Sequence, residues 1–183
     1  MKRLLSVFLV LTLALTAAGC AEPEMEARPG TQDEVITAYN ELLTAFGTPL
    51  PHEPGYPGYP EEFGDAYLED GCLVICLTEN TRKMRDTYRD RVSQPELLCF
   101  VEVEHSYNNL YALQMALNAA DPIDGIASYG VDVMENCLSV GIPDLSNTED
   151  ILAQIEARLP QEVRDLFDEL PVSIHQEDYF VPA

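Results

Sequence analysis

The chain has 183 residues, with 10 basic and 32 acidic side chains and a formal net charge of −22. Such a surface is repelled by phosphodiester backbones and by anionic lipid headgroups, which argues against a nucleic-acid-binding role and against direct adhesion of the folded part to a membrane. The length fits one domain or two small subdomains with a sizeable apolar core.

The first twenty residues have the pattern of an export signal. Lys2 and Arg3 precede an apolar run over residues 4–16, and Ala17-Ala18-Gly19 leads into Cys20. The run is shorter than the roughly 20 residues that a membrane-spanning helix needs. A small-residue cleavage site that abuts a cysteine is typical of a lipoprotein signal. We therefore predict that residues 1–20 form a lipoprotein signal, that cleavage falls before Cys20, and that Cys20 carries the lipid.

This prediction places the protein outside the cytoplasm, anchored on the extracytoplasmic face of a bacterial membrane. An ordinary cleaved signal peptide, which would leave Cys20 unmodified, is the alternative. Cleavage before Cys20 takes away Lys2 and Arg3 and no acidic residue, so the net charge falls from −22 to −24. Residues 21–30 are polar, contain two prolines and are interpreted as a tether.

An amphipathic helix and a proline-rich connector are predicted over residues 31–60. Thr31 and Glu34 have capping-box spacing, apolar residues follow at helical intervals, and Gly47 is a typical helix end. Residues 47–60 then contain five prolines and three glycines, which favours an irregular connector.

Residues 61–120 are interpreted as a first ββαβ repeat with a connecting helix. Asp70-Gly71 separates two strand-like runs, 66–69 and 72–77, and this pair favours a two-residue hairpin turn in which both central residues take positive φ. A helix capped by Thr78 is predicted to reach Ser93. A strand over residues 97–104 and a helix starting at Ser106 complete the unit.

Residues 121–183 show the same order of elements and are interpreted as a second repeat with a C-terminal tail. Strands are predicted over 126–133 and 137–142, with a turn between them. Ser146 and Glu149 have capping-box spacing for a helix that reaches Leu159, and a helix over 161–170 and a strand over 172–176 follow. The predicted fold class is α+β, with two small antiparallel or mixed sheets, each covered by helices, behind the N-terminal amphipathic helix.

The residue types of common active sites are present, but not in the spacing that their chemistry needs. No histidine lies in a metal-binding motif, and neither a serine nucleophile elbow nor a phosphate-binding glycine loop occurs. We therefore predict no catalytic residue, no metal site and no cofactor. Two disulfides among the four cysteines after Cys20 are possible in an exported protein, but their apolar, strand-like surroundings favour free buried thiols: Cys72, Cys76, Cys99 and Cys137.

The basic residues are concentrated in one helix. Five of the eight that follow Cys20 fall within residues 82–91, and Arg82, Arg85 and Arg89 share a helix face at i, i+3 and i+7. We interpret this face as a candidate docking stripe for a wall polymer, a headgroup or an acidic protein. The alternative is a solvated face paired with nearby carboxylates. Tyr179 and Phe180 in the tail are further candidate partner-binding residues, against the alternative of a packed or frayed terminus.

Several short motifs resemble the pro-regions of secreted proteases of the α-lytic type. The motifs are Phe63-Gly64-Asp65-Ala66-Tyr67-Leu68 before a turn, Val103-Glu104-His105-Ser106-Tyr107-Asn108-Asn109-Leu110 at a strand-to-helix passage, and Tyr129-Gly130-Val131-Asp132 with Leu138-Ser139-Val140 in the second half. The chain is also similar throughout to small exported bacterial lipoproteins of uncharacterised role. The pro-region resemblance covers residues 60–178 and implies a sheet that packs against a protein partner and a tail that enters a protease cleft. No protease follows Ala183 in this sequence, so such a role would operate in trans.

Three function classes follow. The first is a membrane-anchored, non-enzymatic interaction module that binds or inhibits a secreted or envelope protein, such as a protease, through an exposed sheet. The second is a small-ligand or cation-binding lipoprotein, which needs a cavity. The third is an exported hydrolase that uses carboxylates, which needs a cleft with convergent acids of displaced pKa.

Overall fold

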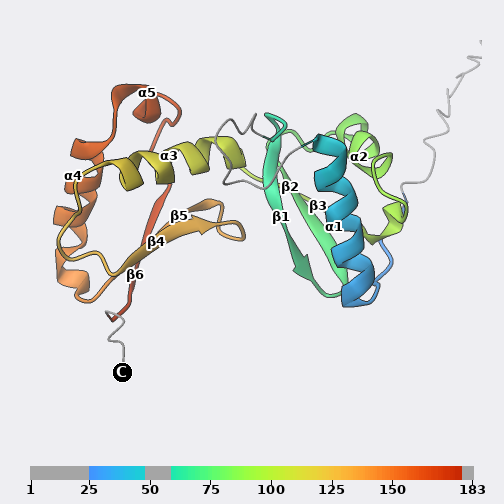
Figure 1. Cartoon of the computed structure of the whole chain (residues 1–183), viewed down its shortest axis with the longest axis horizontal. Helices are drawn as coiled ribbons and strands as arrows, with labels where there is room; N and C mark the ends of the chain where they lie inside the picture. The colour runs from blue at the N-terminus through green and yellow to red at the C-terminus, as the bar shows by residue number, and fades with distance from the viewer. Residues whose placement is uncertain (1–24, 48–58, 179–183) are drawn as a thin grey trace, which may run out of the picture.

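The computed structural model describes residues 25–47 and 59–178. Within these ranges the chain is a mixed α+β protein with two three-stranded sheets and five α-helices (Figure 1). Helix α1, Gln32–Phe46, begins with a capping box: the Thr31 hydroxyl accepts from the Glu34 N–H at 3.4 Å, and the Glu34 carboxylate accepts from the Thr31 N–H at 2.8 Å. Gly47 ends the helix in the left-handed conformation.

The first sheet has the strand order β1-β2-β3, with β1 at Phe63–Glu69, β2 at Cys72–Leu77 and β3 at Leu98–Glu102. Strand β1 pairs antiparallel with β2, whereas β3 pairs parallel with β2. The turn between β1 and β2 is the predicted two-residue hairpin, since Asp70 and Gly71 have φ of 48° and 78°. Helix α2, Arg82–Arg89, and a 3₁₀ turn at Pro95–Leu97 connect β2 to β3.

The predicted helix from Thr78 to Ser93 is wrong at both ends. Thr78 still belongs to the end of the sheet, because its N–H donates to the Glu62 carbonyl at 2.9 Å. Thr81 is the cap instead, and its hydroxyl accepts from the Met84 N–H at 3.2 Å. A threonine is a good cap at either position, so the sheet register decides between the two.

Helix α3, Tyr107–Ala119, starts at the predicted cap Ser106 and contacts strands of both sheets (Figure 1). The second sheet has the order β4-β5-β6, with β4 at Ser128–Asp132, β5 at Cys137–Ile142 and β6 at Val172–Gln176. Its pairing directions match those of the first sheet, antiparallel and then parallel.

The connection from β5 to β6 contains the 3₁₀ turn Leu145–Asn147 and two helices, α4 at Thr148–Arg158 and α5 at Gln161–Arg164. The Ser146 capping box is wrong: the Asp144 carboxylate accepts from the Ser146 N–H at 2.9 Å, so Ser146 lies inside the preceding turn. Helix α5 also ends six residues before the predicted Leu170.

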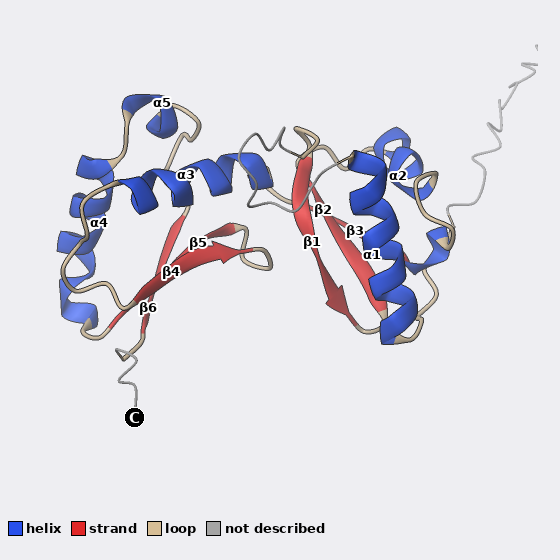
Figure 2. Cartoon of the chain, in the orientation of Figure 1, coloured by secondary structure: helices blue, strands red, loops and turns tan. Residues whose placement is uncertain are grey.

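Each sheet is covered by helices on one face, as Figure 2 shows. In the first sheet, Leu73, Ile75 and Leu77 of β2 are buried in a cluster with residues of α1 and with Tyr88 of α2. In the second sheet, alternate residues of β5 pack in a cluster with residues of α3 and α4: Leu138, Val140 and Ile142. Because strand side chains alternate between faces, residues such as Val74 and Ser139 lie on the opposite faces.

One side chain joins the two halves of the molecule away from α3. The Asn136 amide accepts from the His105 N–H at 2.7 Å and donates to the His105 carbonyl at 2.9 Å. Asn136 has a φ of 50°, which asparagine adopts more readily than most residues. The His105 ring also lies edge-on to Phe167, with 5.3 Å between centroids.

Candidate functional site

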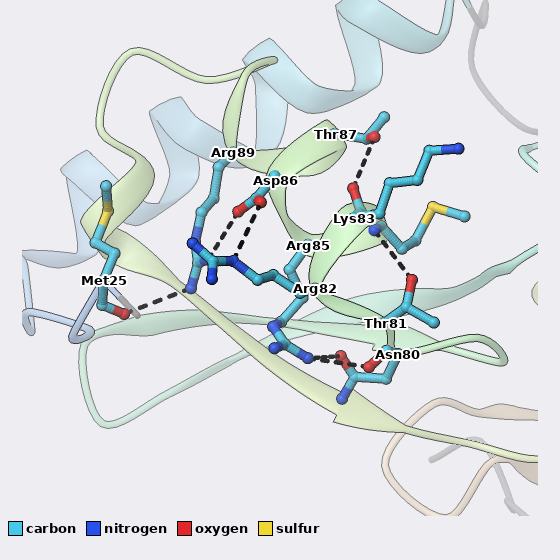
Figure 3. Close-up of polar contacts among 10 residues, drawn as sticks. Met25, Asn80, Thr81, Arg82, Lys83, Arg85, Asp86, Thr87 and Arg89 are labelled. Atoms are coloured by element: carbon cyan, nitrogen blue, oxygen red, sulfur yellow. Dashed lines mark hydrogen bonds and ion pairs between the residues drawn. The ribbon is translucent and has the colours of Figure 1, made fainter. Parts of the chain in front are cut away.

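The three predicted docking arginines occupy α2, and the structure holds them in different ways (Figure 3). Arg82 is half exposed and its Nε lies 3.8 Å from Asp86 Oδ2. Arg85 is partly buried, and its Nη1 donates to the Asn80 carbonyl at 2.9 Å. Asp86 therefore pairs with part of this face, as the solvated alternative expects, while Arg85 is tied to the backbone just before the helix.

Arg89 is largely enclosed, with its side chain 11% exposed, compared with 50% for Arg82. Its Nη1 lies 3.3 Å from Asp86 Oδ1, its Nη2 donates to the Met25 carbonyl at 3.5 Å, and its guanidinium lies 5.2 Å from the centroid of the Phe100 ring. A cation over an aromatic face is stabilised by the ring quadrupole. Arg89 is thus held beside β3 by contacts on several sides.

Arg85 and Arg89 line a shallow groove of about 360 Å³. Residues of β3 from Leu98 to Phe100 form another part of its lining, and Met25 and Ala27 form a third. The groove therefore runs along β3, which is an edge strand because, among the described strands, it pairs only with β2. Sequence reasoning identified the arginines from their spacing, but it could not show that they flank a strand edge.

The hydrogen-bonding groups of this edge follow from the register of the sheet. The Val103 N–H donates to the Leu77 carbonyl of β2 at 3.0 Å, so the alternate residues of β3 direct their backbone groups away from β2. These are Leu98, Phe100 and Glu102. The Leu98 N–H donates to the Pro95 carbonyl, but the Leu98 carbonyl and both backbone groups of Phe100 face outward beside the arginines.

The opposite face of the first sheet carries three thiols. Cys72, Cys76 and Cys99 alternate with the core residues, and all three are free, as is Cys137 in the second sheet. Burial raises the pKa of both Cys76 and Cys99 to about 11, and the neighbouring Cys72 thiol contributes to the shift of Cys99. The free state agrees with the sequence expectation, and thiols of raised pKa are poor nucleophiles.

Asp65 is the described carboxylate with the largest displacement of its pKa, which burial raises to about 6. It lies at an irregularity in the β1–β2 register, with a φ of 85°, and its carboxylate accepts from the Ala66 N–H at 2.8 Å. Its charge also contributes to raising the pKa of Tyr107 to about 12. A strained, partly buried acid is typical of functional sites, but among the described residues no other carboxylate contributes to the shift of the Asp65 pKa, as a closely coupled acid pair would.

A serine, a histidine and a glutamate meet on the uncovered face of the second sheet, which sequence reasoning missed. Ser139 Oγ lies 3.2 Å from His175 Nδ1, and His175 Nε2 lies 3.4 Å from Glu177 Oε2. His175 and Glu177 are nearly half exposed, and the described pockets lie elsewhere. With these two side chains nearly half exposed, the polar row lies open to solvent, whereas nucleophilic catalysis uses a water-excluded environment.

A partly enclosed pocket lies in the second half of the described residues. It has a volume of about 260 Å³ between the end of α3 and the start of β4, and the Tyr129 hydroxyl donates to Asn118 Oδ1 at 2.9 Å at its wall. The described residues form no group of three or more metal-ligating side chains. Across residues 25–47 and 59–178, no helix has the length and apolarity to cross a membrane.

Neither a protein-family model nor a curated protein matches the sequence of this chain. The remaining predicted site residues, Cys20, Tyr179 and Phe180, lie outside the described residues. The basic groove beside β3 is therefore the place where the structure brings together sequence-predicted site residues and a surface suited to binding.

Proposed function

We propose that this chain is a lipid-anchored extracytoplasmic interaction module that binds a secreted or envelope protein through the first sheet. The proposal rests on one observation. The outward-facing backbone groups of β3, with which no described strand pairs, lie beside the positively charged side chains of Arg85 and Arg89. An edge strand binds an extended partner segment through main-chain hydrogen bonds. Clustered arginines select the charge of that segment.

The anchor is part of the same proposal. The sequence of residues 1–20 supports export and lipid attachment at Cys20. The resemblance to small bacterial lipoproteins and to protease pro-regions supports an extracytoplasmic protein partner. We also propose that the two halves are ββαβ repeats, which the matching strand orders and pairing directions of the two sheets support.

Site-specific photo-crosslinking in cells tests this function. A benzoylphenylalanine at Glu102, an exposed residue of β3, is expected to give a protein adduct. The same group at Leu152, an exposed residue of α4, is the matched control and is expected to give none. Adducts at both positions, or at neither, would contradict binding through the β3 edge.

A second candidate function rests on the pocket at the end of α3. Its volume of about 260 Å³ and its mixed lining, from Leu117 to Tyr129, would fit a small polar molecule. Thermal-shift screening with small polar metabolites, repeated on Asn118→Leu, tests this alternative. Stabilisation that the substitution removes supports ligand binding, and the absence of any stabilising compound argues against it.

A further inference from the structure

The segment Met25–Gly30 lies across the β3 edge and already occupies part of the groove. The Arg28 N–H donates to the Glu96 carbonyl at 2.7 Å, just before β3, and Arg28 Nη2 lies 3.2 Å from Glu96 Oε1. Met25 and Ala27 line the groove opposite Arg85 and Arg89. Glu96 lies in the 3₁₀ turn Pro95–Leu97, so the segment is bonded to the turn that leads into β3, while Met25 and Ala27 lie beside the strand itself.

This segment is held weakly. Residues 25–29 are all exposed, and the ion pair of Arg28 with Glu96 has side chains that are 63% and 32% exposed. An ion pair of this kind contributes little to stability. The contact of Arg89 with the Met25 carbonyl, at 3.5 Å, is at the limit of a hydrogen bond. The end of the segment is better fixed, because the Gly30 N–H donates to the Gly71 carbonyl at 2.8 Å.

We propose that residues 25–28 form a displaceable strap over the β3 edge, and that an extended acidic peptide strand of the partner takes their place. The inference rests on the proposed function. Charge complementarity identifies the occupant: five of the eight basic residues after Cys20 lie within residues 82–91, in a chain of net charge −22.

A strap that competes with the partner lowers the apparent affinity, since only the fraction of molecules with a free edge can bind. Weakening the strap must therefore strengthen binding, even when the change removes a positive charge. General electrostatic attraction predicts the opposite, because an acidic peptide binds less tightly to a protein that has lost an arginine. The two explanations thus predict opposite changes in the affinity for an acidic peptide when an arginine of the strap is removed.

The test uses a synthetic eight-residue peptide of alternating Glu and Val, with a Lys and Val peptide as the charge control, and fluorescence anisotropy as the readout. Arg28→Pro removes both the backbone donor to Glu96 and the ion pair, so it is expected to bind the acidic peptide about fivefold more tightly than the natural protein. Arg85→Gln is expected to bind about fivefold more weakly. Arg158→Gln, which removes a charge from α4, is the matched control and is expected to bind like the natural protein.

Three results would overturn the strap. If the acidic peptide binds and Arg85→Gln weakens it, but Arg28→Pro does not tighten it, the groove binds acidic strands without a strap and the proposed function stands. If no variant binds the peptide while Glu102 still crosslinks to a protein, the acidic strand is the wrong occupant. If vesicles of anionic phospholipid bind through Arg85 and the peptide does not, the groove recognises headgroups instead.

Discussion

At the scale of single residues, the ionised Asp65 side chain destabilises the folded state. Its φ of 85° lies in a region that only a few side chains tolerate, and its carboxyl is partly buried beside the irregular start of β1. Burial disfavours the charged form and raises the pKa from 3.8 to about 6. The native state therefore binds this proton more tightly than the unfolded state does.

The consequence for stability has a definite sign. Near pH 4 the native Asp65 is protonated and the penalty is small, whereas above pH 6 the native state must hold a charge that is partly withdrawn from water. Asp65→Asn keeps a side chain that tolerates positive φ and can accept from Ala66. We expect it to be more stable than the natural protein by about 2 kcal/mol at pH 8, with little difference at pH 4. Guanidinium unfolding at both pH values measures the difference in free energy of unfolding between the variant and the natural protein. An equal difference at pH 4 and pH 8 would contradict the account.

The sequence predicts which side chains lie together where their spacing within one helix determines it. It does not predict contacts between side chains from segments that are distant in the sequence. Arg82, Arg85 and Arg89 share a face because helical geometry requires it. The enclosure of Arg89 against Phe100 depends on where α2 packs on the sheet, and no local pattern contains that information. The meeting of Ser139 with His175, 36 residues away, depends in the same way on the parallel register of β5 and β6.

At the scale of elements, the hairpin between β1 and β2 also positions the strap. Gly71 has a φ of 78°, and a Cβ on it would lie 2.8 Å from the Gly30 carbonyl oxygen and 3.1 Å from the Pro29 Cβ. The same turn residue thus allows the hairpin to close and the segment of residues 29–30 to lie against it. Asp70-Gly71 could be read from the sequence because the turn type demands positive φ at both positions.

Substituting alanine for Gly71 is expected to destabilise the protein by about 1–3 kcal/mol, because it combines an unfavourable φ with a backbone clash. Gly130→Ala is the matched control in a strand of the second sheet, where an added Cβ would meet no atom within 4 Å. Thermal and urea unfolding of the two variants measure the difference. Equal destabilisation by both would show that the contact with residues 29–30 is unimportant.

Element boundaries were less predictable than element types. The strands Cys72–Leu77, Cys137–Ile142 and Val172–Gln176 have the predicted bounds, because each is a short apolar or alternating run between turn signals. The first residue of a helix was harder to predict, because several residues near it can serve as the N-cap. Thr81 and not Thr78 caps α2, and tertiary hydrogen bonds of the sheet decide this.

At the scale of the whole molecule, we propose that a lipid anchor holds an acidic folded part whose basic groove binds the partner. Cys20→Ser is expected to abolish incorporation of labelled palmitate and to release the protein from the membrane fraction, since the thioether would have no sulfur to form on. Cys137→Ser, which removes a buried thiol after the signal, is the control and is expected to keep the label. A labelled Cys20→Ser protein would contradict the anchor.

The central claim is that the outward edge of β3 is the binding surface, and amide hydrogen exchange of individual residues tests it most directly. With the acidic peptide bound, the amides of Phe100 and Glu102 are expected to exchange at least about tenfold more slowly, because a partner strand accepts their hydrogen bonds. The Val103 N–H already donates to β2 and serves as an internal control, with no change expected. Saturated binding that leaves the exchange of Phe100 and Glu102 unchanged would contradict the account.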